Sequence, residues 1–486
     1  MSDAALINAI ADWARASAAA EARKLAAIAE LVRRRCTDSE HPEWVCDGWD
    51  AAAAEVSCAL TMGHGRALGQ MDLALTLCDR LPEVGRRFLA GEIPLRAVTK
   101  IAFRTALVCD DDALHQLDRA LAERAAEWGP LSDYKLEKAI DVWVDQLDPG
   151  AIRRTRNSTR GRYFTVGDRN DADGSTSVFG RLTNPDAAVL EQRLGAMVKT
   201  VCDDDPRTMA QRRADAVGAM AAGANHLMCR CGGPNCTAAV DDGRASSVVV
   251  HVVAERESLE QSVDPLLDGE GLVPEDAGPA TQRAKAALIP AHKGAIVPAP
   301  LLAELIAHGA KVRFIGAPVT DAEDRYRPST ALQEFVRTRD LTCRFPGCDR
   351  PALFADIDHT SAWPAGLTHP ANLKCYCRIH HLLKTFWDGW ADSQEPDGNV
   401  VVTTPSGHTY STKPLSSLLF PTWNTTTPPP PPSPSLREPT PPPAPGRNLM
   451  MPTRRVSRAK AREYRINAER ALNEVIVAER DEPPPF

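Results

Sequence analysis

Two short pairs of potential metal ligands lie close together in the last third of the chain. Cys343 and Cys348 are separated by four residues, and Cys377 and His380 by two. Such pairs can close a tetrahedron of thiolate and imidazole around Zn²⁺ when a hairpin and a following helix bring them together. The turn-forming sequence Phe345-Pro346-Gly347 lies within the first pair. We therefore predict a small module folded around a structural zinc ion, rather than reduced thiols that pack as small hydrophobic residues.

Cys375 complicates this ligand set because it lies only two positions before Cys377. It could compete as a ligand, although on a helix that step would turn the two side chains to roughly opposite faces. The sequence leaves the role of Cys375 open.

Four further residues of this block can carry chemistry if zinc takes those ligands: Asp358, His359, Asn372 and His381. The block resembles the HNH endonuclease family, whose ββα-metal motif reads Asp-His, a Gly-containing loop, Asn-Leu, and Cys-x-x-Cys/His-His. The matching residues are Asp358-His359, Gly366, Asn372-Leu373, Cys377-Arg378-Ile379-His380-His381 and Lys384. Taken one at a time, each has an ordinary explanation as a surface acid, a satisfied histidine or a helix cap.

The resemblance implies a metal-dependent endonuclease that hydrolyses DNA phosphodiester bonds by a one-metal mechanism. His359 would deprotonate the attacking water, and Asn372 would orient it or its loop. Asp358 and His381 would hold an exchangeable Mg²⁺, Mn²⁺ or Ni²⁺ ion, while the zinc ion is structural. The alternative is a non-cleaving, zinc-dependent nucleic-acid-binding or mobile-element accessory protein that keeps the fold.

Local charge in this block agrees with a phosphate-bearing substrate. The HNH resemblance makes Arg378 and Lys384 the expected contacts to nucleic acid, with double-stranded DNA as the expected partner; a solvated surface is the alternative. The whole chain has a net charge of −7 and a pI of about 6.0, which excludes a globally basic protein that coats nucleic acid. Seven basic residues accompany four aspartates between Arg337 and Trp387, namely Arg337, Arg339, Arg344, Arg350, Lys374, Arg378 and Lys384.

A length of 486 residues, of which 43% are hydrophobic and 25% charged, accommodates two to four globular domains. Asp3 and Asp12 interrupt the first residues, so we expect no signal peptide. No apolar run reaches the roughly 18 to 20 residues that span a bilayer, so we expect no membrane-spanning segment and no membrane partner. Thirteen cysteines fit a reducing, cytoplasmic location. Nothing in these features indicates an oligomeric state.

Five segments are predicted along the chain. The first has the periodicity of an alanine-rich helical bundle, and the second combines helices with short strands at 162–166, 175–182, 247–254 and 311–315. We expect a mainly α (α+β) fold, in which a helical domain with a few short strands precedes a zinc-stapled ββα-metal domain and a disordered Pro-rich tail. The segments are the helical bundle (1–150), its α+β continuation (151–325), the HNH nuclease domain (326–415), the Pro-rich linker (416–450) and a basic C-terminal helix (451–486).

The order of RLPEVGRRFLAGEIPLRAVTKI, RTMAQRRADAVGAM and CRCGGPNC ahead of the zinc block resembles the actinobacterial thirteen-E-twelve repeat proteins. In these proteins a long helical domain of unknown function precedes a C-terminal HNH module. The resemblance covers residues 1 to 415, and only its last part has motifs tied to a mechanism.

A second cysteine cluster, Cys229-Arg-Cys231-Gly-Gly-Pro-Asn-Cys236, follows closely after His226. These three thiols and this imidazole are candidate ligands for a second zinc ion, and the Gly-Gly-Pro turn suits a zinc knuckle. A redox pair or plain buried thiols are the alternatives. The remaining cysteines are scattered and suggest no site: Cys36, Cys46, Cys58, Cys78, Cys109 and Cys202.

A basic cluster begins the helix predicted after the Pro-rich segment. This helix could contact DNA phosphates or dock on a partner, and a solvated helix is the alternative because acids are interleaved. The cluster consists of Arg454, Arg455, Arg458, Lys460 and Arg462.

Overall fold

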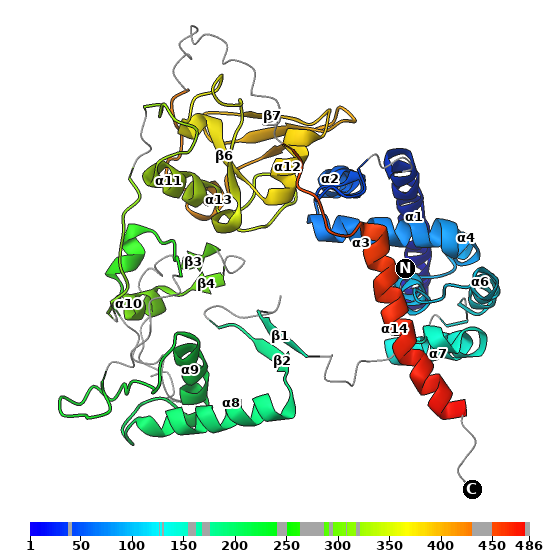
Figure 1. Cartoon of the computed structure of the whole chain (residues 1–486), viewed down its shortest axis with the longest axis horizontal. Helices are drawn as coiled ribbons and strands as arrows, with labels where there is room; N and C mark the ends of the chain where they lie inside the picture. Colours follow the sequence, from blue (N-terminus) through cyan, green and yellow to red (C-terminus); the bar gives the residue numbers. More distant parts are fainter. Residues whose placement is uncertain are drawn as a thin grey trace.

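The chain folds into an N-terminal helical bundle, a central α+β region and a module that contains the predicted zinc ligands (Figure 1). In the view of Figure 1 the bundle lies on the right, the central region at the lower left and the module above. The computed structural model describes residues 1–36, 41–125, 127–128, 131–153, 162–167, 175–240, 250–262, 286–290, 295–307, 309–316, 321–429 and 450–481.

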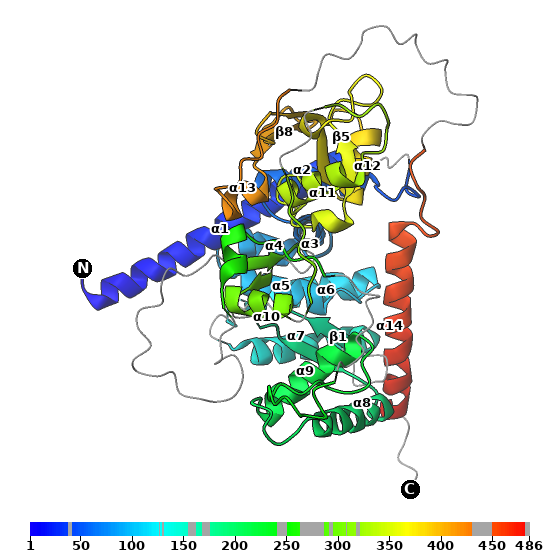
Figure 2. The same ribbon diagram turned by 90° about the vertical axis from the view of Figure 1, so that its left-hand side faces the viewer.

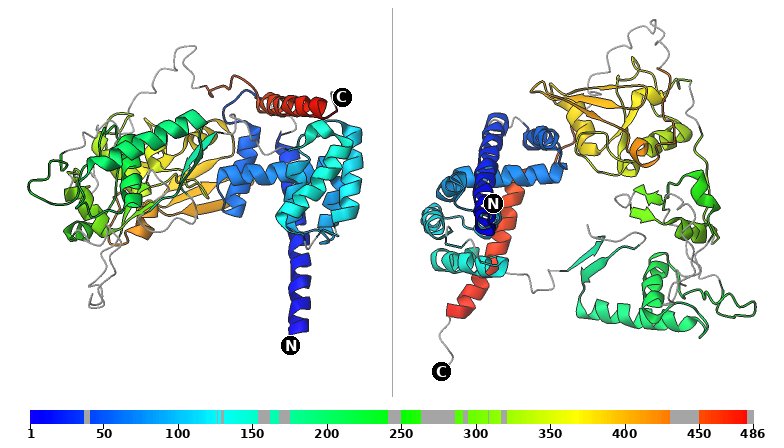
Figure 3. Two further views of the ribbon diagram at one scale, coloured as in Figure 1. Left: turned by 90° about the horizontal axis from the view of Figure 1, so that it is seen from below. Right: turned by 180° about the vertical axis from the view of Figure 1, so that it is seen from behind.

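Amphipathic helices build the bundle. Helix α1 buries Ala18, Ala22, Leu25, Ala29 and Val32, whose spacing of three or four residues places them on one face. The first half of α1 is exposed and extends away from the other helices (Figures 2 and 3). The helices are α1 (Asp3–Cys36), α2 (Gly48–Leu60), α3 (His64–Leu75), α4 (Pro82–Leu89), α5 (Leu95–Arg104), α6 (Asp111–Ala125) and α7 (Asp133–Leu147), with a π-helical turn (Thr76–Arg80) after α3.

The central region contains the predicted hairpin, two helices, and a second short hairpin that is followed by a third helix. Strands β1 and β2 are antiparallel, and Thr208 and Gln211 form a capping box at the start of α9. The predicted strand at 311–315 is wrong: this segment is exposed and irregular, and no described strand pairs with it. The predicted strand 247–254 falls partly outside the described residues. The elements are β1 (Tyr163–Val166), β2 (Val178–Arg181), α8 (Asn184–Met197), α9 (Met209–Ala221), β3 (Ala287–Ile289), β4 (Ala295–Val297) and α10 (Ala299–Ala307).

The module has the predicted order of two antiparallel strands followed by a helix. Strand β5 pairs with β6 in a register that places Asp358 opposite Lys374 and His359 opposite Leu373, and α12 follows β6 after one residue. A three-stranded sheet of order β7-β8-β9 extends the module. The elements are α11 (Thr330–Asp340), β5 (Asp356–His359), β6 (Leu373–Tyr376), α12 (Arg378–Phe386), β7 (Ala391–Gln394), β8 (Val400–Thr403), β9 (Thr409–Thr412) and α13 (Leu415–Leu419).

The described elements are mostly helices, accompanied by small two- and three-stranded sheets, so the predicted mainly helical fold class is confirmed. Among the described residues no helix is both long and apolar enough to cross a bilayer.

The module and the bundle share one hydrophobic core. Ala54 and Cys58 of α2 are buried in the same cluster as Tyr376 and Leu383 of the module. Trp387 also donates its indole N–H to the carbonyl of Cys46, at 2.9 Å. Because these side chains exclude water together, the stability of the module depends on the bundle.

The segment after the Pro-rich linker returns to this junction. Thr453 forms a β-bridge with Trp44, and the Arg454 and Arg458 guanidinium groups contact the carboxylates of Asp47 and Asp50. The two aspartates are buried, so the arginines supply the positive charge that buried carboxylates need.

Helix α14 (Arg458–Asp481) packs along the bundle beside α7 (Figures 1 and 3). Arg470 pairs with Asp148 at 2.6 Å, and Arg480 pairs with Asp145 at 3.0 Å. The Asn473 amide donates to the carbonyls of residues 150 and 152. Arg458, Arg470 and Arg480 of this helix are therefore engaged in contacts within the protein.

Candidate metal centre and active site

The predicted zinc ligands meet at the start of α12. Cys343, Cys348, Cys377 and His380 offer ligand atoms that all lie within 4.8 Å of one another. The Nδ1 atom of His380 is 3.5 Å from Cys343 Sγ and 3.3 Å from Cys377 Sγ, and the sulfurs of Cys348 and Cys377 are 4.0 Å apart. Zinc bonds of about 2.0–2.3 Å in a tetrahedron place ligand atoms roughly 3.5–3.8 Å apart, so this donor set fits Zn²⁺.

Local packing fixes this donor set. The Phe345 ring stacks on His380 with centroids 3.8 Å apart, which locks the imidazole. Gly347 has φ +73°, and an added Cβ would lie 2.5 Å from the Met62 carbonyl oxygen in the α2–α3 turn. Burial raises the pKa of Cys343, whereas its hydrogen bond to Cys377 lowers the pKa of Cys377. A bound cation would stabilise the additional thiolates that burial disfavours.

Cys375 is a core residue and lies outside the cluster. It is fully buried in β6, where it packs with Leu332, Phe335 and Leu373. Its backbone N–H donates to the Asp340 carboxylate at 2.7 Å. The chain turns after Tyr376, so Cys377 stands at the N-cap of α12 and the two thiols point to different environments.

A histidine of the bundle contacts the zinc-ligand cluster. The rings of His64 and His380 meet edge to face with centroids 5.6 Å apart. His64 Nε2 lies 3.0 Å from Asp50 Oδ1, and Asp50 also binds Arg454 and Arg458. His64 Nδ1 and His380 Nε2 are buried, and neither has a hydrogen-bond partner among the described residues. The bundle therefore packs directly against the imidazole of a predicted zinc ligand through this ring contact.

The two predicted ligands of the catalytic ion face each other. His381 Nε2 lies 3.5 Å from Asp358 Oδ1, while His381 Nδ1 lies 2.9 Å from Asp356 Oδ2. The Asp356 carboxylate thus favours the tautomer in which Nε2 keeps its lone pair. Two ligands of one divalent ion at about 2.1 Å stand roughly 3.0–3.4 Å apart, so a small adjustment of this pair would accommodate the ion.

Two lysines already neutralise Asp358. Lys374 Nζ lies 3.0 Å from both Asp358 and Asp392, and Lys384 Nζ lies 2.7 Å from Asp358 and 3.3 Å from Asp392. Both lysines oppose the two aspartates, whose side chains are 9% (Asp358) and 2% (Asp392) exposed, and burial lowers the pKa of Lys374. Lys384, expected to contact DNA, is therefore engaged inside the module. Arg378 remains exposed and pairs with Asp356 at 3.2 Å.

His359 is held on two sides beside this network. Its ring stacks on Tyr326 with centroids 5.4 Å apart, and its Nε2 lies 2.8 Å from Thr368 Oγ1. The Thr368 hydroxyl donates to the carbonyl of Arg325, so it accepts a hydrogen bond from Nε2–H and leaves Nδ1 as the basic nitrogen. Burial lowers the pKa of His359, which favours the neutral imidazole that a general base requires.

Asn372 fastens the loop between β5 and β6. Its amide nitrogen donates to the carbonyls of Ser361 and Leu367, and its Oδ1 accepts the Ser361 N–H at 2.8 Å. In the described part of the chain Asn372 forms no hydrogen bond with His359, and its side chain instead joins the two ends of the loop.

Gly366→Ala should destabilise the module by about 1–3 kcal/mol, because overpacking costs that much in a closed environment. An added Cβ would lie 2.1 Å from the Ser361 carbonyl oxygen and 2.7 Å from Asn372 Nδ2. Thermal unfolding measures the effect. Gly69→Ala is the matched control, since Gly69 lies in α3 with nothing within 4 Å of an added Cβ. A Gly366 variant as stable as the wild type would contradict this account of the loop.

Most of the basic residues between Arg337 and Trp387 are engaged in contacts within the protein. Arg339 is buried and donates to the carbonyls of Pro370 and Leu373 at 2.9 Å and 2.7 Å. Arg344 is buried and binds the carbonyl of Thr412. Buried arginines paired with carbonyls cannot also contact phosphate, so the local charge count overstated the exposed positive charge.

The second cysteine cluster has a different fourth member from the one predicted. Cys229, Cys231 and Cys236 come together with Cys202, not with His226. The His226 ring contacts the carbonyl of residue 240 at 3.3 Å instead. The sequence reading missed Cys202 because this residue lies before α9 and far from the CRCGGPNC motif.

Other residues of the site were missed for a similar reason. Three come from outside the Cys343–His381 block and three lie within it, but none belongs to the recognised motif, so no local signal marks their role in the site. They are His64, Tyr326, Asp356, Thr368, Lys374 and Asp392.

Comparison with known proteins places the chain in a family. Residues 12–340 match the family described as "Domain of unknown function (DUF222)". "Uncharacterized protein Rv2100" of Mycobacterium tuberculosis (strain ATCC 25618 / H37Rv) is 53% identical over 502 residues, which cover 100% of this chain and 90% of the relative. "Uncharacterized protein Rv3776" of the same strain is 53% identical over 489 residues, covering 99% and 92%. No solved structure matches the chain. The extent of these matches shows that the chain belongs to the DUF222 family.

Proposed function

We propose that the protein is a metal-dependent endonuclease of HNH type that hydrolyses DNA phosphodiester bonds. The observation that carries this proposal is the β5–β6–α12 unit, which brings His359 beside the facing pair of Asp358 and His381, with the zinc-ligand cluster at the start of the helix. Fold and family alone would not support a reaction, so the proposal depends on these side chains.

Each residue has a defined role in this proposal. His359 takes a proton from water at Nδ1, while Thr368 and Tyr326 hold the ring in position. Asp358 and His381 would hold Mg²⁺, Mn²⁺ or Ni²⁺. Such an ion supplies positive charge for the scissile phosphate and the leaving oxygen. The zinc-ligand cluster keeps the N-terminus of α12 fixed against β6 and therefore fixes His381.

A second candidate is a non-cleaving protein that binds nucleic acid through the same fold. Lys374 and Lys384 satisfy the Asp358 carboxylate without any added ion, which favours this alternative. A catalytic ion would have to bind Asp358 through Oδ1 while Oδ2 stays with the lysines.

Supercoiled plasmid incubated with the purified chain and Mg²⁺, Mn²⁺ or Ni²⁺ tests the proposal. Nicking should require one of these ions, and His381→Ala should abolish it, because the variant loses the imidazole that faces Asp358. DNA binding and bound zinc should persist in this variant. His115→Ala, which changes an exposed histidine of α6, is the control. Binding without nicking under all three ions would favour the second candidate, and nicking unaffected by His381→Ala would contradict the assigned ligand.

A further inference from the structure

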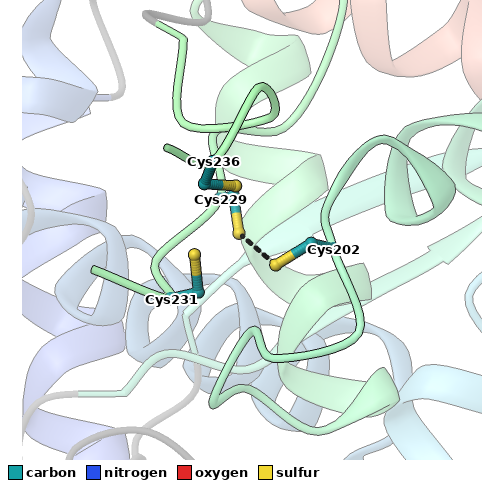
Figure 4. A group of neighbouring side chains, drawn as sticks. All are labelled: Cys202, Cys229, Cys231 and Cys236. Atoms are coloured by element: carbon teal, nitrogen blue, oxygen red, sulfur yellow. Dashed lines mark hydrogen bonds between the residues drawn. The ribbon is translucent and has the colours of Figure 1, made fainter. Parts of the chain in front are cut away.

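Four cysteines of the central region gather outside the module. Figure 4 shows the side chains of Cys202, Cys229, Cys231 and Cys236 directed toward one another. Their sulfurs all lie within 4.8 Å of one another, and the sulfurs of Cys202 and Cys229 are 3.4 Å apart. We propose that these four thiolates form a second, structural zinc site of Cys₄ type, independent of the nuclease proposal.

The chain around the motif has the local geometry of a thiolate-binding turn. Gly232 adopts φ +68°, a left-handed conformation that suits glycine. This turn brings the backbone N–H of Gly233 to 3.4 Å from Cys231 Sγ, and the N–H of Cys236 donates back to the Gly233 carbonyl at 3.1 Å. An N–H directed at sulfur favours the ionised thiol, which is the form that binds zinc.

The burial of the four thiols differs from that of cysteines that fill a core. Cys229 is buried, whereas Cys202, Cys231 and Cys236 are only partly buried. Apolar packing alone does not explain why three partly exposed thiols converge with a fourth within 4.8 Å, which separates the cluster from ordinary buried cysteine.

Buried ion pairs hold the two ligand-bearing segments together without relying on the sulfurs. Arg207 is buried, pairs with Asp205 at 2.7 Å, and donates to the carbonyl of Met228 at 2.8 Å. The N–H of Arg230 donates to Asp205 at 2.9 Å. These contacts place Cys202 next to the CRCGGPNC motif and so preorganise the set.

The hydrophobic core around the four cysteines is small, so a bound metal would contribute to its stability. The helices α8 and α9 bury a cluster formed by Leu194, Met197, Ala216, Ala219, Ala224 and Leu227, three of which are alanines. A unit with so few large buried side chains gains little from apolar burial, and a metal commonly supplies the rest. Four protein ligands also fill a tetrahedral zinc ion, so this site is structural rather than catalytic.

Two disulfides are the competing explanation for four neighbouring cysteines. Disulfides require only that the sulfurs approach in pairs, whereas here all four lie within one mutual distance limit. The backbone N–H of Gly233 is directed at the Cys231 sulfur, a contact that stabilises a thiolate more than a disulfide sulfur.

Zinc analysis of the purified full-length chain tests the site. Cys202→Ala should lower bound zinc by one ion per chain, and His226→Ala should leave it unchanged, because His226 lies outside the cluster. Cys109→Ala controls for loss of an exposed thiol. Zinc lost with His226→Ala and retained with Cys202→Ala would overturn the proposed ligand set.

A measurement on the wild type keeps the proposal testable if Cys202→Ala does not fold. After unfolding in chelator without reductant, all 13 cysteines should react with a thiol reagent, since none is oxidised in a zinc site. A count lower by four, with peptides joined within the cluster in mass spectrometry, would show two disulfides and overturn the proposal. Nicking activity does not enter either readout, so failure of the nuclease proposal leaves this test unaffected.

Discussion

His359→Ala is expected to lower the rate of metal-dependent plasmid nicking by about 10²–10⁴-fold, the range that general acid–base catalysis supplies. DNA binding and zinc content should stay at the wild-type level. The reason is local. The His359 ring lies between Tyr326 and Thr368, and the hydroxyl that accepts from its Nε2 leaves Nδ1 free to take a proton.

The pH dependence follows from the environment of the same ring. Burial lowers the pKa of His359 below its ordinary value of about 6.5, so the neutral base predominates at pH 7 and the rate should fall only when the pH drops below about 6.5. Thr368→Val should reduce the rate less than His359→Ala. It removes the hydroxyl that orients the His359 ring but leaves the imidazole base in place.

His408→Ala is the matched control for this experiment. His408 lies at the exposed β8–β9 turn, where its Nδ1 contacts the Ser406 hydroxyl. The variant should nick plasmid at the wild-type rate. Nicking that persists unchanged in His359→Ala would remove His359 from the mechanism, whatever the effect of His381→Ala.

The second large effect is expected at the zinc-ligand cluster. Cys377→Ala should lower bound zinc by one ion per chain and abolish the cooperative unfolding of the module. Structural zinc contributes about 10–16 kcal/mol of apparent binding free energy in zinc-finger peptides, which is comparable to the stability of a whole domain. Cys377 also stands at the N-cap of α12, so its loss releases both the metal and the start of the helix.

Loss of zinc should also destabilise the N-terminal bundle, because the bundle and the module share a hydrophobic core. Trp387 packs edge to face on Trp44 with centroids 5.8 Å apart, and Cys46, Ala54 and Cys58 are buried with residues of the module. Tryptophan fluorescence should therefore shift to longer wavelength as this junction gains water. Thermal unfolding followed by fluorescence and by circular dichroism measures both effects.

Cys375→Ala provides the control, with the same substitution two positions away. It removes a fully buried sulfur from a different core and should cost stability without loss of zinc. Equal zinc content in the wild type and in Cys377→Ala would contradict the assigned ligand set.

Local patterns in the sequence predicted the elements that carry the candidate site. The spacing of Cys343, Cys348, Cys377 and His380 predicted a cluster. In the structure the ligand atoms of these residues all lie within 4.8 Å of one another. The order of two strands and a helix was implied by the resemblance to the HNH family, whose motif residues occur within one short stretch. Short-range spacing determines such features because turns and helices fix neighbouring side chains.

Predictions that needed distant partners failed more often. The segment 311–315 has the composition of a strand, yet a strand needs a neighbour for its backbone hydrogen bonds, and no described strand lies beside it. Lys384, the expected DNA contact, also has a partner that the motif does not contain: its Nζ lies 3.3 Å from the carboxylate of Asp392, which follows α12 by several residues. Its contact with DNA stays a prediction.

The sequence by itself determined the mainly helical class, the Cys/His cluster of the module and the Asp-His-Asn-His series beside it. Only the tertiary structure decided that Cys202 replaces His226 in the second cluster, that Lys374 and Lys384 neutralise Asp358, and that α14 docks on the bundle. The physical reason is the range of the interactions. Spacing within a turn or helix is set by covalent geometry, whereas these contacts join residues far apart in the chain and form only when burial and charge pairing favour the whole fold.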